Sequence, residues 1–130
     1  MKELKIITRN RNEMIDITDE IQKAVEEENF QSGYIIAYTP HTTAAITINE
    51  GADPNVQKDI IETLNKIIPR KGYHHLEGNS DAHIKASLLG SSTTVLVENK
   101  KLVLGTWQRI FFFEGDGPRH RRVFISLFPR

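Results

Sequence analysis

The stretch TTVLVENKKLVLGTWQRIFFFEGDGPRHRRVFISL, residues 93–127, decides the fold class. It contains four short runs rich in β-branched and aromatic residues, at 93–97, 102–104, 110–113 and 123–127, separated by Gly, Asn, Asp and Pro. That alternation is typical of antiparallel strands joined by turns. Upstream, the runs at 4–7, 14–17, 33–39 and 44–48 add further strands. Sheet is therefore expected to dominate the protein.

Three helices are predicted between these strands. The first has Thr18 as its cap and reaches about Glu28, and the second has Asp53 as N-cap and Pro54 at its first position. The third covers 82–89, with Ser80 or Asp81 as its cap, and stops at Gly90. The class is then α+β, a mainly antiparallel β-sheet with about three helices packed on one face. The polar turn 9–12 separates the runs 4–7 and 14–17, which predicts a hairpin there.

Length and composition exclude several classes of protein. The 130 residues fit a single domain, 1–130, without linker, repeat or low-complexity tract. Lys plus Arg and Asp plus Glu number 17 each, so no global field attracts nucleic acid or an anionic membrane. Cysteine is absent, which excludes disulfides and thiolate ligands. No apolar stretch approaches a membrane span and no leader is recognisable at the start, so we expect a cytoplasmic protein.

Four of the five histidines lie in two polar segments, 40–43 and 73–83. His41 follows a strand and a proline, and His75 and His83 flank a glycine-containing loop, a spacing that allows both to face one point without requiring it. Loop histidines are more often structural or solvated than functional. If they do bind a metal, three imidazoles without thiolate indicate an open site with a position left for water or ligand.

Polar residues elsewhere also have structural and functional interpretations. Glu50 shares strand parity with the apolar residues 46 and 48, so burying its carboxylate costs free energy unless the group is paired or bound to something. Gly105 before Trp107 indicates either a bulge with a core tryptophan or close approach of a ligand. Arg119 and Arg121 share parity with the apolar residues of 123–127, so they are predicted to point inward unless a bulge intervenes. Inward arginines need an anion, either a carboxylate such as Glu114 or a phosphate.

Four motifs in order resemble the YjbQ family. They are HTTAAITINE with ADP at 41–54, Asn79 with AHIKASLLG at 82–90, LGTWQ at 104–108 and EGDGPR at 114–119. The resemblance runs from about residue 39 to the C-terminus. It implies a small α+β protein that assembles as a homotrimer and acts as a secondary thiamine-phosphate synthase. That reaction joins hydroxymethylpyrimidine diphosphate to hydroxyethylthiazole phosphate and releases diphosphate.

The resemblance also implies roles for individual residues. The catalytic set is Glu50, His41 and Arg119, and the substrate-binding set is Asn49, Trp107, Gln108, Glu114 and Arg121. The metal ligands implied are His41, His75 and His83, with His74 as the alternative to His75. Zinc is the expected divalent metal, and magnesium could accompany the diphosphate.

Physical chemistry assigns tasks to these groups. Negative charge grows on the departing diphosphate, so cations such as Arg119, Arg121 or a divalent metal would lower the barrier. Trp107 could stack on a pyrimidine ring, and Glu50 could hydrogen-bond to its edge or move a proton. If residues 41–49 form a straight strand, its ends lie about 26 Å apart. We therefore expect a composite site at a subunit interface, in which His41 meets residues of another subunit.

Two other functions remain open on the sequence. One is a metal- or small-ligand-binding protein with a different physiological task, because no phosphate-binding glycine loop is present. The other is a phosphate-ester hydrolase that uses metal-bound water at the same histidines. In each case the partners expected are small phosphorylated molecules, with no nucleic acid and no membrane.

Overall fold

The computed structural model describes residues 1–130 as eight strands and three helices. In chain order they are β1 (Lys2–Ile7), β2 (Glu13–Asp16), α1 (Thr18–Glu27), β3 (Gly33–Tyr38), β4 (Ala44–Glu50), α2 (Pro54–Ile67), α3 (Ser80–Leu89), β5 (Ser92–Glu98), β6 (Lys101–Leu102), β7 (Gln108–Glu114) and β8 (His120–Pro129). Three of the strands predicted in the last third are confirmed, whereas the run 102–104 is a strand only at Leu102, and Gly90 is confirmed at the end of α3.

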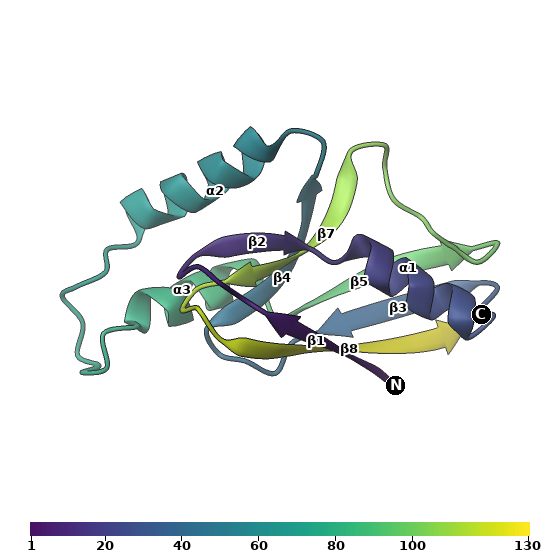
Figure 1. Ribbon diagram of the computed structural model, residues 1–130, viewed down its shortest axis with the longest axis horizontal. Helices are drawn as coiled ribbons and strands as arrows, with labels where there is room; N and C mark the ends of the chain where they lie inside the picture. Colours follow the sequence, from purple (N-terminus) through teal and green to yellow (C-terminus); the bar gives the residue numbers. More distant parts are fainter.

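The strands form two sheets, both antiparallel throughout. One has the order β1-β8-β3-β5-β6 and the other β2-β7-β4, and Figure 1 shows them layered against each other. One core cluster joins the sheets and α1: Ile35 and Val95 come from the first sheet, Ile46 and Phe112 from the second, and Ile21 from the helix. The α+β class is confirmed, with two sheets where one was expected.

The predicted hairpin at residues 9–12 is wrong. β1 pairs with β8 and β2 pairs with β7, so the turn carries the chain from one sheet to the other. Turn composition specifies only local bending, whereas the pairing partner is chosen by which apolar faces can be buried together. Pairing with the C-terminal strands buries Ile6 beside Val123 and Ile125 in the shared core.

The three helices differ in how much they bury. α1 buries Ile21, Ala24 and Val25. The predicted cap at Thr18 is wrong, because Ile17 holds the cap position and the Thr18 hydroxyl accepts a hydrogen bond from Ile110 N at 2.7 Å instead. α2 begins as predicted, with the Asp53 side chain accepting a hydrogen bond from Asn55 N at 2.9 Å, but it contains no buried residue and lies away from both sheets in Figure 1. α3 packs against β4 and buries two charged residues, as described below.

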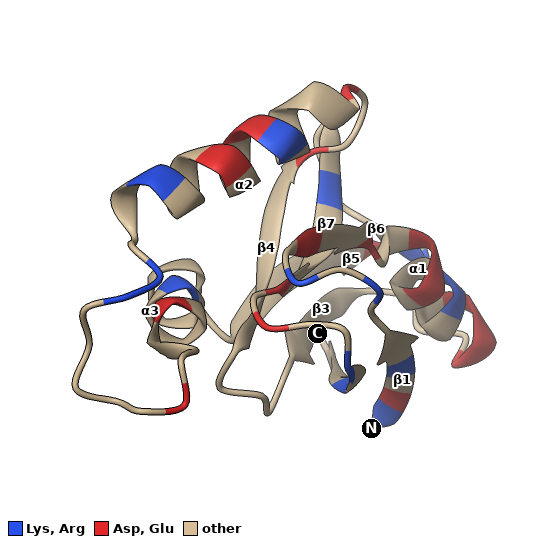
Figure 2. Cartoon of the chain, turned by 60° about the vertical axis from the view of Figure 1, so that its left-hand side comes forward, with Lys and Arg blue, Asp and Glu red and all other residues tan.

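No helix of the chain combines the length and the hydrophobicity needed to cross a bilayer. A cytoplasmic location stays a prediction. Figure 2 shows acidic and basic residues distributed along the outward helices α1 and α2 and also on α3.

Candidate functional site

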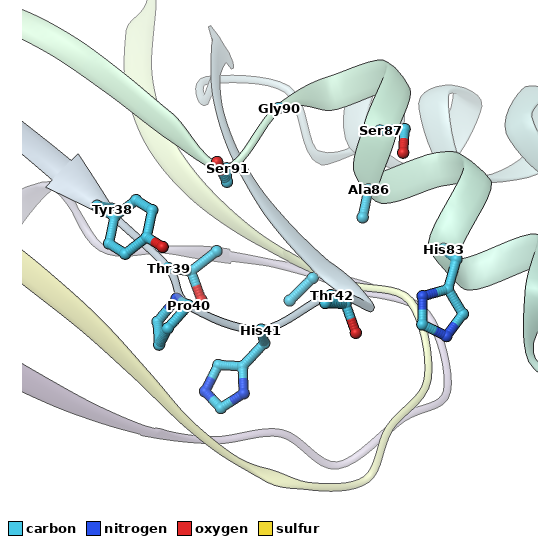
Figure 3. A pocket seen from close by; sticks show the side chains of 11 residues that line it. Tyr38, Thr39, Pro40, His41, Thr42, His83, Ala86, Ser87, Gly90 and Ser91 are labelled. Atoms are coloured by element: carbon cyan, nitrogen blue, oxygen red, sulfur yellow. The ribbon is translucent and has the colours of Figure 1, made fainter.

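Two adjoining cavities lie where the β3–β4 connection meets α3. The larger, about 650 Å³, has no hydrophobic lining residue, and the smaller is about 510 Å³. Both are lined by Pro40, His41, Thr42 and His83. The larger adds Thr43, Glu77, Asn79, Pro118, Arg119, His120 and Arg121; the smaller adds Tyr38, Thr39, Ala44, Ala86, Ser87, Gly90 and Ser91. In Figure 3 His41 projects from the β3–β4 segment and His83 from α3.

His41 is held by the backbone of β8. Its Nε2 atom accepts a hydrogen bond from Arg122 N at 3.0 Å. Burial lowers the pKa of His41, and the positive charges of Arg121 and Arg122 lower it further. The ring is therefore neutral at pH 7 with its proton on Nδ1, so it can donate a hydrogen bond from Nδ1.

His75 and His83 are neighbours. Their ring centroids lie 5.7 Å apart in an edge-to-face arrangement, and His75 Nε2 is 3.7 Å from Glu77 Oε1. The chain gathers no group of three His, Asp or Glu side chains that could hold a metal ion. The structure thus places two of the predicted ligands together, but His41, whose Nε2 is already engaged, does not join them within one chain.

Arg121 and Glu114 form a buried ion pair. Arg121 Nε donates to Glu114 Oε1 at 2.8 Å and its Nη2 also contacts this carboxylate; Nη2 donates to Thr43 Oγ1 at 2.8 Å. Burial raises the pKa of Glu114, but Arg121 and the donors Asp116 N and Thr8 Oγ1 outweigh it and leave that pKa lowered. Of the two anions predicted for an inward arginine, the chain supplies the carboxylate. The Nη1 group of Arg121 makes no hydrogen bond within the chain.

Arg119 does not point inward, contrary to the parity prediction. Its side chain is 51% exposed, and it donates from Nε to Asp116 O at 2.8 Å and from Nη2 to Asp116 Oδ2 at 2.9 Å. Because β8 begins only at His120, strand alternation does not extend to Arg119. The side chain instead borders the larger cavity beside Asn79.

The remaining predicted residues lie at the other end of the β4–β7 ladder. Glu50 pairs with Gln108 there, whereas Ala44 pairs with Glu114 near His41. Six strand steps separate these pairs, about 20 Å. Trp107 is 62% exposed, so it is not a core residue of this chain. Asn49 is exposed, and Glu50 is half-buried and forms no ion pair.

Sequence reasoning gave no role to Asn79, whose Oδ1 is buried without a hydrogen-bond partner, or to a charged network behind the cavity. That network contains Arg11, Asp81, Lys85 and Asp116. The i,i+4 spacing of Asp81 and Lys85 on a helix was the one signal for it in the sequence. Nothing in the sequence linked Arg11 to either residue.

Fold and site define a small α+β protein with two antiparallel sheets and a surface cavity lined by histidine and arginine. The chain belongs to the YjbQ family, since the family model described as "UPF0047 protein YjbQ-like" matches residues 2–130.

Curated relatives and solved structures agree with this assignment. The chain is 48% identical over 129 residues to the UPF0047 protein YugU of Bacillus subtilis, covering 98% of each chain. It is 51% identical over 124 residues to the UPF0047 protein MJ1081 of Methanocaldococcus jannaschii, covering 95% of this chain and 90% of that protein. An uncharacterized conserved YjbQ/UPF0047 family protein from Clostridium acetobutylicum has a TM-score of 0.97 at 52% identity, covering 98% of this chain and 100% of that chain.

Proposed function

We propose that this protein is a thiamine-phosphate synthase-type enzyme, which condenses hydroxymethylpyrimidine diphosphate with hydroxyethylthiazole phosphate and releases diphosphate. The observation that carries the proposal is the pair of adjoining cavities that share His41 and His83. The larger cavity, lined mainly by polar and charged side chains, suits a diphosphate, and the smaller one, bordered by Tyr38 and Ala44, suits an uncharged ring.

The residues of the larger cavity suit a leaving diphosphate. As the carbon–oxygen bond to diphosphate lengthens, negative charge grows on the departing oxygens, and donors aimed there stabilise the transition state more than the ground state. Arg119, the free Nη1 of Arg121 and the Nδ1 proton of neutral His41 are available for this task. Because His41 is neutral, it assists as a hydrogen-bond donor without adding a charge to the site.

A divalent metal, zinc in the first instance, is proposed only at His75 and His83. These two side chains fit two positions of a metal centre, and His41 does not fit as the third. A bound metal would supply Lewis-acid stabilisation of phosphate oxygens. Elemental analysis beside His83→Ala tests this part separately from turnover.

The proposal includes a second copy of the chain, in a homotrimer with the site at the subunit interface. Asn49, Glu50, Trp107 and Gln108 lie about 20 Å along the ladder from His41, too far to contact one small substrate with it. Exposed Trp107 suits an interface residue, since tryptophan is enriched in interfaces. Glu50 and Trp107 would then reach the smaller cavity of a neighbouring copy.

The test is turnover of the two precursors by the wild type and by folded His41→Ala and Arg119→Ala variants, with diphosphate binding measured by calorimetry in parallel. Arg9→Ala is the matched control, because Arg9 is exposed and forms no ion pair. The proposal predicts that both variants lose turnover and bind diphosphate more weakly, while the control keeps both. Full activity in His41→Ala and Arg119→Ala would contradict it. Metal binding with negligible turnover would favour a ligand-binding protein, and slow cleavage of phosphate esters would favour a hydrolase.

A further inference from the structure

The turn at residues 9–12, which joins β1 to β2, contacts the 115–118 turn, whose Pro118 lines the larger cavity. Gly117 N donates to Arg11 O at 3.0 Å, so the backbone of this turn holds the 115–118 turn that precedes Arg119. A Cβ atom at Gly117 would collide with Asn10 O, so the two turns are in close backbone contact. The turn predicted to close a hairpin is thus a support for the cavity wall.

The Arg11 side chain connects two carboxylates from different segments. Nη1 donates to Asp81 Oδ2 at 2.9 Å and Nη2 to Asp81 Oδ1 at 3.1 Å. Nη2 also lies 3.8 Å from Asp116 Oδ1. The Asp81 side chain is only 2% exposed, so Arg11, together with Lys85, provides the charge that makes its burial tolerable. A planar guanidinium can address both carboxylates at once, which a lysine ammonium cannot do with the same geometry.

Asp116 in turn holds two residues that line the cavity. Its Oδ2 accepts from Asn79 Nδ2 at 3.0 Å and from Arg119 Nη2 at 2.9 Å, and its backbone oxygen accepts from Arg119 Nε at 2.8 Å. Burial raises the pKa of Asp116, but the bonds from Asn79 and Arg119 and the charge of Arg11 leave it lowered. The carboxylate is ionised at pH 7, so it can hold both donors.

The other arm of the network fixes α3. Lys85 is fully buried, and its Nζ lies 3.6 Å from Asp81 Oδ2 and donates to Asn12 Oδ1 at 3.1 Å and to Asn65 Oδ1 in α2. Asn12 belongs to the same turn as Arg11. The turn therefore contacts two buried residues of α3, Asp81 and Lys85. The same helix carries His83.

From this arrangement we propose that Arg11 is a positioning residue, which acts through Asp116 and Asp81 to hold Arg119, Asn79 and the start of α3 at the larger cavity. Arg11 does not line that cavity, so any effect it has on a ligand there passes through these residues. The expected effect of Arg11 on ligand binding rests on the proposed function in one respect, namely that the larger cavity binds a phosphate group.

The first experiment needs no ligand. The Nε–Hε signal of Arg119, assigned by its loss in Arg119→Lys, is followed by NMR in the wild type, Arg11→Met, Asp116→Asn and the control Arg9→Met. Arg11→Met and Asp116→Asn are expected to speed exchange of this proton with water by at least about tenfold, because the bonded state opens more often. If Arg11→Met does not fold, Arg11→Lys decides, because it keeps a positive charge beside Asp81 but cannot address both carboxylates at once. Unchanged exchange in a folded variant would overturn the proposal.

The second experiment measures inorganic diphosphate binding by calorimetry. Arg11→Met should weaken binding by about tenfold or more, and Arg9→Met should not change it. Combined with Arg119→Ala, Arg11→Met should cost less than the sum of the two single losses, because part of its effect passes through Arg119. Fully additive losses would overturn the proposal. If the wild type binds no diphosphate, the phosphate site of the proposed function fails, and the exchange measurement alone decides the role of Arg11.

Discussion

Glu114 and Glu50 stand at opposite ends of the same β4–β7 ladder and have opposite environments. Glu114 is fully buried and accepts hydrogen bonds from Arg121, Thr8 and Asp116 N. Glu50 is half-buried and has no cationic partner, and its neighbour Trp107 is largely exposed. The carboxylate at the first end is fully hydrogen-bonded within one chain, whereas at the second end Glu50 forms no ion pair and Trp107 is 62% exposed. A complete site therefore requires a second copy if both ends act on one substrate.

The largest expected effect comes from mixing two inactive variants. His41→Ala and Glu50→Gln should each lose activity by about a hundredfold or more. If each site combines His41 of one subunit with Glu50 of the next, trimers that contain both variants should regain about one third of wild-type activity, because each of them has one intact site of three. The measurement is turnover after co-expression with two affinity tags. An inactive mixture of confirmed hetero-oligomers would mean that the two ends do not share a site.

The same substitution should have very different structural costs at the two ends. Glu114→Gln leaves the buried Arg121 charge uncompensated, which should lower the free energy of unfolding by about 3–5 kcal/mol. Glu50→Gln should change it by no more than about 0.5 kcal/mol. Urea unfolding followed by circular dichroism measures both. Similar losses in the two variants would show that Glu50 has a partner that one chain does not reveal.

Low pH should destabilise the protein mainly through carboxylates on the Glu114 side of the molecule. The pKa values of Glu114, Asp81 and Asp116 are lowered from 4.5, 3.8 and 3.8, because Arg121, Arg11 and the Asn79 and Arg119 donors outweigh the effect of burial. A carboxylate with a depressed folded-state pKa contributes stability above its unfolded pKa and loses it as pH falls through the folded value. Stability should therefore fall below about pH 5. The fall should be shallower in Glu114→Gln than in Glu50→Gln, and equal slopes would refute the assignment to Glu114.

The smallest effect expected is spectroscopic. Trp107 is the only tryptophan of the chain and is 62% exposed in a single copy. If a neighbouring copy covers it, its emission should shift to the blue and acrylamide quenching should weaken as the protein concentration rises through the association range. The oligomer mass is taken from the same samples. Association without any change in emission would place Trp107 outside the interface.

Much of the fold was predictable because its signals are local. The Asp53 cap, the Gly90 stop and the β-rich last third act over a few residues, and all three are confirmed. The hairpin at 9–12 and the inward Arg119 were wrong because pairing partners and side-chain direction depend on distant strands. The face of α3 that is buried could not be predicted from amphipathicity, since Asp81 and Lys85 are buried while Leu88 is 63% exposed.

In the candidate site, too, some features were predictable from local sequence and others were not. The motifs identified His41, His83 and Arg119 as functional candidates and strand parity identified Arg121, and the structure places all four around the larger cavity. The sequence by itself determined the α+β class, the family and these residues, because residue type and short spacing encode them. Only the tertiary structure decided that Glu114 neutralises Arg121, that Glu50 and Trp107 lie at the far end, and that Arg11 supports the cavity. Arg11 and Asp81 are 70 positions apart, and the place of Glu50 and Trp107 follows from the pairing of β4 with β7. Glu114 and Arg121 are only 7 positions apart, but their pairing depends on the burial of both side chains. None of this is visible in local patterns.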